Sequence, residues 1–364
     1  MRLILCGDIC PTDATRAAFE AGDRKALFGS ALEVIQSADL AVANLECALT
    51  HSESRIRKFG PNLKGKPEWA SVLAAAGFTH MGLSNNHVMD FGLQGLRDTI
   101  SAVEAAGMTA FGVGENDQDS RKPLLLEHDG LRIAIVAVCE HEYSYALPDR
   151  MGSNPFDPFD TMEDIALARE QADWVIVMYH GGKEQCEYPS PRLRKACRAM
   201  VRAGADLVLC QHSHCIGTAE IYRGGKIIYG MGNFLFAKYM DDPQWGSGSM
   251  LDISLSRETF DITFLPVVVT DSGITLAQGA QKAEIMEELE SRSRLLQDDE
   301  AWMRAWKAFC DSKPYYYDAV RSAMQDVPEG ESCAQLFAHY LDCEAHLDVW
   351  KTLFPTWHAA KTTE

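Results

Sequence analysis

Short apolar runs rich in valine, isoleucine and leucine alternate with helical patterns through most of the chain. Such runs are typical of strands buried in a sheet, whereas apolar spacings of three and four indicate a helix with one buried face. In the first half this pattern predicts strands over residues 2–9, 39–47, 80–87 and 109–114. It predicts helices over residues 11–37, 69–77 and 93–107.

The second half changes rhythm. A hairpin is predicted around Asp129 and Gly130, followed by helices over 160–172 and 191–205 and strands over 174–182 and 206–214. Short strands with turn signals then fill 219–236, 249–256 and 260–270, with Gly224 and Gly225 as a hairpin turn. Strands that first alternate with helices and later form hairpins predict two sheets packed face to face, with helices outside.

From about Lys282 the pattern is helical and amphipathic, and its aromatic residues Trp302, Trp306, Phe309 and Trp350 are available to dock. We therefore predict two domains, a catalytic domain over residues 1–280 and a helical appendage over residues 281–364.

Polar residues stand where several predicted strands end. They offer carboxylate, amide and imidazole groups, which are ligands that divalent metals use in proteins. A pair of metals sharing a bridging carboxylate needs about this many groups from several strands. The residues are Asp8, Glu46, Asn86, His180, His212 and His214.

Each of these residues also has a structural explanation. Asp8 or Asp13 would serve as a helix N-cap, and Glu46 would pair with an arginine or lysine. Turn chemistry accounts for Asn85 and Asn86 but less well for the neighbouring His87 and Asp90. A single histidine at a strand end is more often structural, but three histidines on two strand ends favour ligands.

Composition narrows the function. The 364 residues are 46% hydrophobic, enough for a substantial core, and the formal net charge is −18. This charge disfavours a nucleic-acid partner and suits cations or cationic and neutral substrates, although acidic solvated faces are common in cytosolic proteins. No GxGxxG, P-loop or GxSxG motif is present, which disfavours nucleotide-fold dehydrogenases, P-loop ATPases and serine hydrolases.

A cytoplasmic location is expected. The sequence MRLILCGDIC enters a predicted strand without a signal-peptide pattern, and no run approaches the ~18 apolar residues that cross a bilayer. Eleven cysteines form no CxxC pair. Those at positions 6, 47, 139 and 210 lie in apolar runs, as buried reduced thiols would.

The motifs GDI, NLE, NNHVMDFG, HGGKE, HSHCIG and GGKIIYGMGNFLF follow one another over residues 1–270. Together they resemble the bacterial CapA (PgsA-type) capsule and poly-γ-glutamate synthesis family, a branch of the calcineurin-like metallophosphoesterase superfamily. The resemblance implies an α/β fold, a double β-sandwich flanked by helices in four αββα layers. It also implies two divalent metal ions (Mn, Fe or Zn) at the strand ends.

The resemblance assigns roles residue by residue. It implies metal ligands at Asp8, Glu46, Asn86, His180, His212 and His214, with Glu46 bridging. It implies an acid imidazole at His87, a basic loop that grips a substrate carboxylate or phosphate at Lys58, Lys64 and Lys66, and pocket-lining residues at Glu184 and Asn233. The chain departs from the family at His180-Gly181-Gly182, where His-Trp-Gly is usual, and at Cys215 and Ile216, where valines are usual.

Three functions are compatible with these residues. The first is hydrolysis of a phosphoester or of an amide in a γ-glutamyl-type peptide or polymer, with His87, Asp8 and His214 as catalytic residues. The second is metal-assisted epimerisation of a peptide residue, with Asp8 or a nearby histidine moving the Cα proton. The third is a non-catalytic polymer-binding accessory role. The expected substrate is a peptide, a polyglutamate-like chain or a phosphorylated small molecule, and no integral membrane segment is expected.

Overall fold

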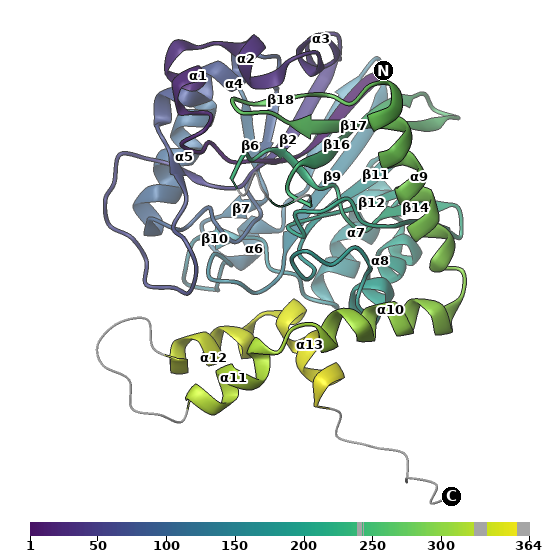
Figure 1. Ribbon diagram of the computed structural model, residues 1–364. Coiled ribbons are helices and arrows are strands. Elements are labelled where there is room, and N and C mark those ends of the chain that lie inside the picture. Colours follow the sequence, from purple (N-terminus) through teal and green to yellow (C-terminus); the bar gives the residue numbers. More distant parts are fainter. Residues whose placement is uncertain (239–241, 243, 324–332, 355–364) are drawn as a thin grey trace, which may run out of the picture.

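Two β-sheets face each other with helices on both outer faces in the computed structural model, which describes residues 1–238, 242, 244–323 and 333–354 (Figure 1). The four-layer αββα arrangement that the family resemblance implies is therefore confirmed.

The first sheet runs in the order β18-β17-β16-β1-β2-β5-β6, and β15 also pairs with β1. Strands β1, β2, β5 and β6 are parallel, while β16, β17 and β18 continue the sheet as antiparallel neighbours. Their bounds are β1 Arg2–Ile9, β2 Leu40–Leu45, β5 His80–Gly82, β6 Thr109–Phe111, β15 Asn233–Leu235, β16 Ser247–Leu255, β17 Phe260–Val269 and β18 Ile274–Leu276.

The second sheet runs in the order β13-β14-β12-β11-β9-β8, with β9, β11, β12 and β14 parallel. Its strands are β8 Leu124–His128, β9 Leu131–Cys139, β11 Trp174–His180, β12 Leu207–Gln211, β13 Ala219–Tyr222 and β14 Gly225–Ile228. Two small pairs complete the strands, β3 Ala48–Leu49 with β4 Lys64–Gly65 and β7 Val113–Gly114 with β10 Gly152–Ser153.

Strand alternation builds the core in layers. On β1, Leu3 and Leu5 point between the sheets, while Ile4 and Cys6 point to the helices outside. Strands β9, β11 and β12 alternate in the same way in the second sheet. Both faces of these strands are apolar because both are covered, which is why they appear in the sequence as continuous hydrophobic runs.

Helices cover the outer faces of both sheets. The first sheet packs against α1 Arg16–Ala21, α2 Arg24–Phe28, α3 Ala31–Gln36, the 3₁₀ turn Pro67–Trp69, α4 Ala70–Ala75 and α5 Gly92–Ala105. The second packs against α7 Asp160–Gln171 and α8 Pro191–Ala203, and the short α6 Asp117–Ser120 lies beside β7.

The structure corrects several predicted boundaries. The single helix expected over residues 11–37 is three short helices, because Gly22 adopts a left-handed conformation with φ 64° and Asp23 then caps a new helix. The turn between β13 and β14 is Arg223–Gly224, with φ of 50° and 90°, and Gly225 already belongs to β14. Strand β18 was not predicted.

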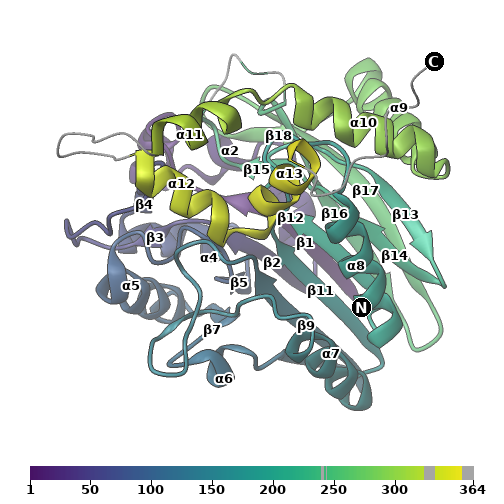
Figure 2. The same ribbon diagram turned by 90° about the horizontal axis from the view of Figure 1, so that it is seen from below.

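Five helices follow the sheets: α9 Gly279–Leu295, α10 Asp299–Asp311, α11 Tyr315–Ala323, α12 Cys333–Asp342 and α13 Glu344–Leu353. Leu296 and Trp302 pack into the cluster on the outer face of the second sheet. The last three helices lie across the end of the sandwich, below the sheets in Figure 1 and over the strands in Figure 2. None of the helices within the described residues is long and apolar enough to cross a membrane.

Two ion-pair groups fasten α13 to the end of the second sheet. Arg192 pairs with Glu140 at 2.5 Å and with Asp348 at 2.9 Å. Burial raises the pKa of Glu140, but Arg192 and Tyr179 outweigh it and hold that pKa below its ordinary value. His141 pairs with Glu344 at 2.7 Å. The C-terminal helices are thus held by charges that lie just past the end of β9.

The inter-sheet core gives a direct test of stability. Leu5 is fully buried between the sheets, so Leu5→Ala should lower the free energy of unfolding by about 2–5 kcal/mol through lost burial and a residual cavity. Leu125→Ala, at a side chain that is 51% exposed on β8, is the matched control and should change it by less than about 0.5 kcal/mol. Urea denaturation measures both, and equal effects would contradict the layer assignment.

Docking of α13 should weaken as pH rises. The hydrogen bond to Glu344, the largest influence, raises the pKa of His141 above 6.5. A folded-state pKa above the unfolded value means that this contribution is complete below pH 6.5 and is lost as pH rises through the raised value. At pH 6 we expect wild type to resist proteolysis within α13 better than His141→Gln, and at pH 9 we expect this advantage to be gone. A wild-type advantage that stays constant over this range would contradict the assignment.

Candidate metal centre

Polar side chains from several strand ends meet at one edge of the sandwich. Asp8 lies near the end of β1 and Glu46 directly after β2, parallel strands of the first sheet. His180 ends β11 and His212 follows β12, parallel strands of the second. Carboxyl ends of parallel strands lie at the same edge of a sheet, so the packing of the sheets brings both sets together. The backbone N–H of His212 donates to Asp8 Oδ2 at 3.1 Å.

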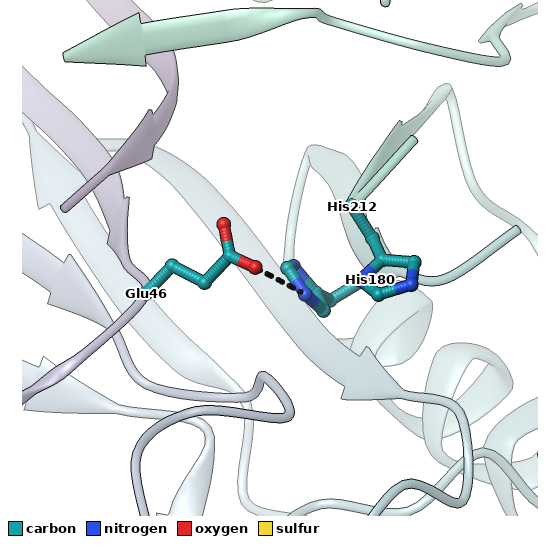
Figure 3. A group of neighbouring side chains, drawn as sticks. All are labelled: Glu46, His180 and His212. Atoms are coloured by element: carbon teal, nitrogen blue, oxygen red, sulfur yellow. Dashed lines mark ion pairs between the residues drawn. The ribbon is translucent and has the colours of Figure 1, made fainter. Parts of the chain in front are cut away.

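Two groups of candidate ligands share Glu46. The ligand atoms of Glu46, His180 and His212 lie within 4.8 Å of one another, and those of Asp8, Glu46 and His214 do likewise. Figure 3 shows Glu46 pointing toward His180, whose Nε2 lies 3.4 Å from Glu46 Oε1. Each group offers the nitrogen and oxygen donors that one divalent cation takes, and a carboxylate common to both is suited to bridging.

The environment of Glu46 bears directly on metal binding. Its side chain is fully buried, and neither carboxylate oxygen has a hydrogen-bond partner among the described residues. Burial, followed by the charge of Asp8, raises its pKa well above the ordinary 4.5. Burying a carboxylate without a partner is costly, and a cation on each oxygen would remove that cost. The residues present therefore fit a pair of metal ions.

The histidines have the form that a metal needs. Burial, reinforced by the neighbouring His180, lowers the pKa of His212 to about 4, and burial also lowers the pKa of His180. Both rings are then neutral at pH 7, with a lone pair for coordination. His212 and His214 have φ of 82° and 55°, left-handed values that are uncommon outside glycine and that concentrate at functional sites.

Three asparagines orient the candidate ligands, two of them from β2 and β15, which both pair with β1 at Asp8. Asn44 Nδ2 donates to Asp8 Oδ1 at 2.7 Å and lies 3.2 Å from His180 Nδ1. Asn233, beside Asp8 on β15, places its Oδ1 2.9 Å from His214 Nδ1, which leaves the Nε2 of that ring for a metal. Hydrogen bonds to the second ring nitrogen are the usual way in which proteins fix a ligating histidine. Asn233 therefore acts on His214 rather than as a free lining group.

The third asparagine, Asn86, reaches the centre from the turn after β5. Its Oδ1 lies 3.0 Å from His180 Nε2, facing the atom that would coordinate a metal. Its Nδ2 donates to Glu142 Oε2 at 2.8 Å, which fixes the amide with its oxygen toward the centre. All six residues that the sequence singled out as ligands thus converge.

His87 lies beside the ligands in a buried group with Asp90 and Lys58. Its Nδ1 is 2.7 Å from Asp90 Oδ2, and Lys58 Nζ pairs with Asp90 Oδ1 at 2.5 Å. Burial, and then Lys58, lower the pKa of His87 to about 4, so the ring is neutral at pH 7. Lys58 Nζ also lies 3.1 Å from His87 Nδ1, so both charged neighbours meet the ring at the same nitrogen, and neither contacts Nε2. A ring that is neutral at pH 7 is suited to accept a proton, and the acid role that the resemblance implies for His87 stays a prediction.

The three lysines of the predicted basic loop separate in the structure. Lys58 is buried against Asp90 and His87. Lys64 pairs with Glu53 at 2.6 Å and Lys66 with Glu20 at 2.8 Å. Lys64 and Lys66 line a groove of about 740 Å³ whose lining includes none of the candidate ligands. Only Lys58 is therefore brought to the centre, and there it is committed to Asp90.

Glu184 lies near the centre with its side chain exposed. The packed atoms around the Glu184 carboxyl reduce its hydration, which raises its pKa. The electrostatic influence of Lys183, His212 and His214 outweighs this effect and brings the pKa to about 2. It is therefore a carboxylate at pH 7, and Lys183 beside it supplies a positive charge.

Sequence reasoning missed four residues that surround the centre. Glu142 follows β9, so the strand-end pattern that identified the other ligands was available for it as well. Lys183 lies between residues that were singled out. His339 and His346 come from α12 and α13, and nothing in the helical pattern of that region indicates where those helices dock.

The fold and the site define a double-sheet α/β protein with a candidate metal centre at the carboxyl ends of its parallel strands. The chain belongs to the family described as "Bacterial capsule synthesis protein PGA_cap", whose profile matches residues 2–238.

Individual relatives carry related names. The chain is 32% identical over 211 residues to "Capsule biosynthesis protein CapA" of Bacillus anthracis, covering 56% of this chain and 51% of that protein. It is 30% identical over 221 residues to a "Probable polyglutamine synthesis accessory protein" of Mycobacterium tuberculosis, covering 57% and 58%. The chain thus matches little more than half the length of these relatives. A 5'-nucleotidase precursor from Thermus thermophilus aligns with a TM-score of 0.43 and 11% identity, covering 82% of this chain and 59% of that one.

Replacing Glu46 by glutamine should have opposite effects with and without metal. In the metal-free protein the folded-state pKa of Glu46 is raised above 4.5. The Glu46 carboxyl therefore destabilises the folded state increasingly as pH rises from 4.5 through the raised pKa, and it has no such effect below pH 4.5. At pH 7 the metal-free Glu46→Gln protein should melt at least about 2 °C above metal-free wild type, and this gain should vanish at pH 4. Added Mn²⁺ or Zn²⁺ should raise the melting temperature of wild type more. Calorimetry that finds metal-free glutamine less stable at pH 7 would show that the carboxylate has a partner.

Proposed function

We propose that this protein is a binuclear metal-dependent hydrolase that cleaves an amide bond of the γ-glutamyl type or a phosphoester. The observation that carries the proposal is Glu46, a buried carboxylate shared by two groups of ligand atoms, whose oxygens have no hydrogen-bond partner among the described residues. If Glu46 only held the fold together, an ordinary ion pair with an arginine or lysine would serve as well as a carboxylate shared by two ligand groups.

The ligands divide between two positions. Asp8, Glu46 and His214 would hold one cation, and Glu46, His180 and His212 the other, with Asn86 Oδ1 facing His180 at the second position. This donor set of imidazole, carboxylate and amide suits Mn, Fe or Zn. Two such cations would supply Lewis-acid polarisation of a substrate oxygen and activation of water near neutral pH.

The residues of the chain perform the remaining steps. Asn44 and Asn233 hold Asp8, His180 and His214 in place through hydrogen bonds. His87 Nε2 would take up the proton that the attacking water loses and pass it to the leaving nitrogen or oxygen, while Asp90 and Lys58 fix the ring. Lys183 and Glu184 present both signs of charge, which suits the amine and carboxylate of a peptide-like substrate.

An amide substrate is favoured over a phosphoester. The carboxylates Glu142 and Glu184 lie beside the centre, and the chain carries a net charge of −18, both unfavourable to a phosphate dianion. The relative named for polyglutamine synthesis supports a substrate whose units are joined by amide bonds. We further propose that the substrate is met in the cytoplasm.

Epimerisation of a peptide residue is the second candidate. His87, neutral and with Nε2 free of the Asp90 bond, is suited to remove a Cα proton. Asp8 is less suited, because Asn44 and the backbone of His212 already occupy its oxygens.

Metal content and turnover test the proposal together. Wild type should bind about two equivalents of Mn²⁺ or Zn²⁺ at this centre, Glu46→Ala should lose both, and Glu127→Ala, at an exposed glutamate on β8, should keep them. The metal-loaded protein should hydrolyse γ-glutamyl peptides or bis(p-nitrophenyl) phosphate, and Glu46→Ala should lose at least about 100-fold in rate.

Deuterium separates the alternatives. Uptake of solvent deuterium at Cα without bond cleavage would identify an epimerase instead. Tight metal binding without either reaction would indicate an accessory protein. Unchanged metal content in Glu46→Ala would remove Glu46 from the centre and overturn the assignment.

A further inference from the structure

The C-terminal helices bring two histidines to the edge of the metal centre. His339 lies in α12 and His346 in α13, helices that cross the end of the sandwich (Figure 2). Both approach Glu142, which follows β9 of the second sheet. The ligand atoms of Glu142, His339 and His346 lie within 4.8 Å of one another, and none of the three residues belongs to the two groups that share Glu46.

We propose that Glu142, His339 and His346 form a third divalent-cation site, built between the sandwich and the C-terminal helices. Two imidazoles and one carboxylate are a donor set that zinc takes in open sites, where a fourth position is left for water or substrate. The proposal does not depend on whether the protein is a hydrolase, because it concerns binding alone.

Each histidine is held by a separate contact. The Tyr316 hydroxyl lies 2.5 Å from His346 Nδ1, which fixes the ring and leaves Nε2 for a cation. The ring of His339 stacks on Tyr143 at 5.1 Å and on Phe59 at 6.1 Å, so residues of the sandwich hold it in position. The two imidazole rings meet edge to face at 4.6 Å.

Glu142 is positioned to receive them. Its Oε1 lies 3.5 Å from His339 Nε2, close to the spacing of two ligand atoms on one zinc ion. Its Oε2 accepts from Asn86 Nδ2 at 2.8 Å and lies 3.8 Å from His212 Nε2. The proposed site therefore adjoins the two ligand groups that share Glu46. Asn86 contacts Glu142 of the proposed site and His180 of those groups.

An ion pair that docks α12 is the simplest competing explanation. It would account for His339 beside Glu142 but not for His346, a second imidazole brought to the same atoms from another helix. Lys183 adds positive charge to this region, and Glu184 next to it offsets that charge. A bound cation explains the convergence of all three donors.

The site would have a definite effect on the protein. A cation held there would fasten α12 and α13 to Glu142, beside the two ligand groups that share Glu46. It would make the C-terminal helices part of the metal centre, although the family match ends at residue 238.

Zinc stoichiometry tests this site. Chelator-treated full-length protein is dialysed against buffered Zn²⁺ and its metal content measured by mass spectrometry. Wild type should hold one equivalent more than His346→Asn and His339→Gln, whereas Glu46→Gln should keep that equivalent. His141→Gln is the matched control, because it weakens the docking of α13 by removing the imidazole contact with Glu344, and His141 is not one of the three proposed ligands. It should retain the full complement.

Two results would overturn the proposal. One is an unchanged zinc content in both His346→Asn and His339→Gln. The other is an equal loss in His141→Gln, which would show that helix docking alone matters. Circular dichroism checks that each variant is folded. Should both histidine variants unfold, anomalous diffraction from zinc-loaded wild type decides, since it must show a peak between Glu142, His339 and His346. A zinc peak at this site without metal at the two ligand groups that share Glu46 would contradict the proposed function and support this site. Metal at those two groups without this peak would do the reverse.

Discussion

The burial of Glu46 between two sheets is the constraint on which the rest of this molecule depends. A carboxylate with no hydrogen-bond partner among the described residues is tolerated in a fully buried position only if something else compensates its charge. The surrounding structure supplies that possibility through imidazoles from the second sheet, a second carboxylate from β1 and an amide from the turn after β5. The candidate metal centre therefore exists only because the two sheets pack with these strand ends at the same edge.

The sequence predicted this edge well because strand ends have a local signature. Asp8, Glu46 and His180 each end an apolar run, and the two runs of parallel strands carry them to a common edge. Even the orienting role of Asn44 has a local cause, since it stands two residues before Glu46 and so faces the same side. Where a residue lies at the end of a buried strand, as these three positions do, the local sequence is informative; Glu142, three residues beyond β9, was missed.

Other features depend on contacts that no local pattern contains. Lys64 and Lys66 share a loop with Lys58, yet their ammonium groups pair with Glu53 and Glu20 in a separate groove. The lowered pKa of His87 comes from burial and from a lysine 29 positions earlier in the chain. The amphipathic pattern of the C-terminal helices predicts that they have a buried face, but not that these helices meet Glu140 and Glu142.

The contacts of Trp302 have a consequence for how the chain can be divided. Its indole stacks on the Arg194 guanidinium at 4.4 Å, donates to the Pro189 carbonyl and belongs to the apolar cluster outside the second sheet. A protein shortened at residue 280 would therefore expose apolar surface along α8 to water, and exposed apolar patches promote self-association. An exchange of the C-terminal helices between relatives would have to keep the apolar surface of α8 and the helix that covers it together.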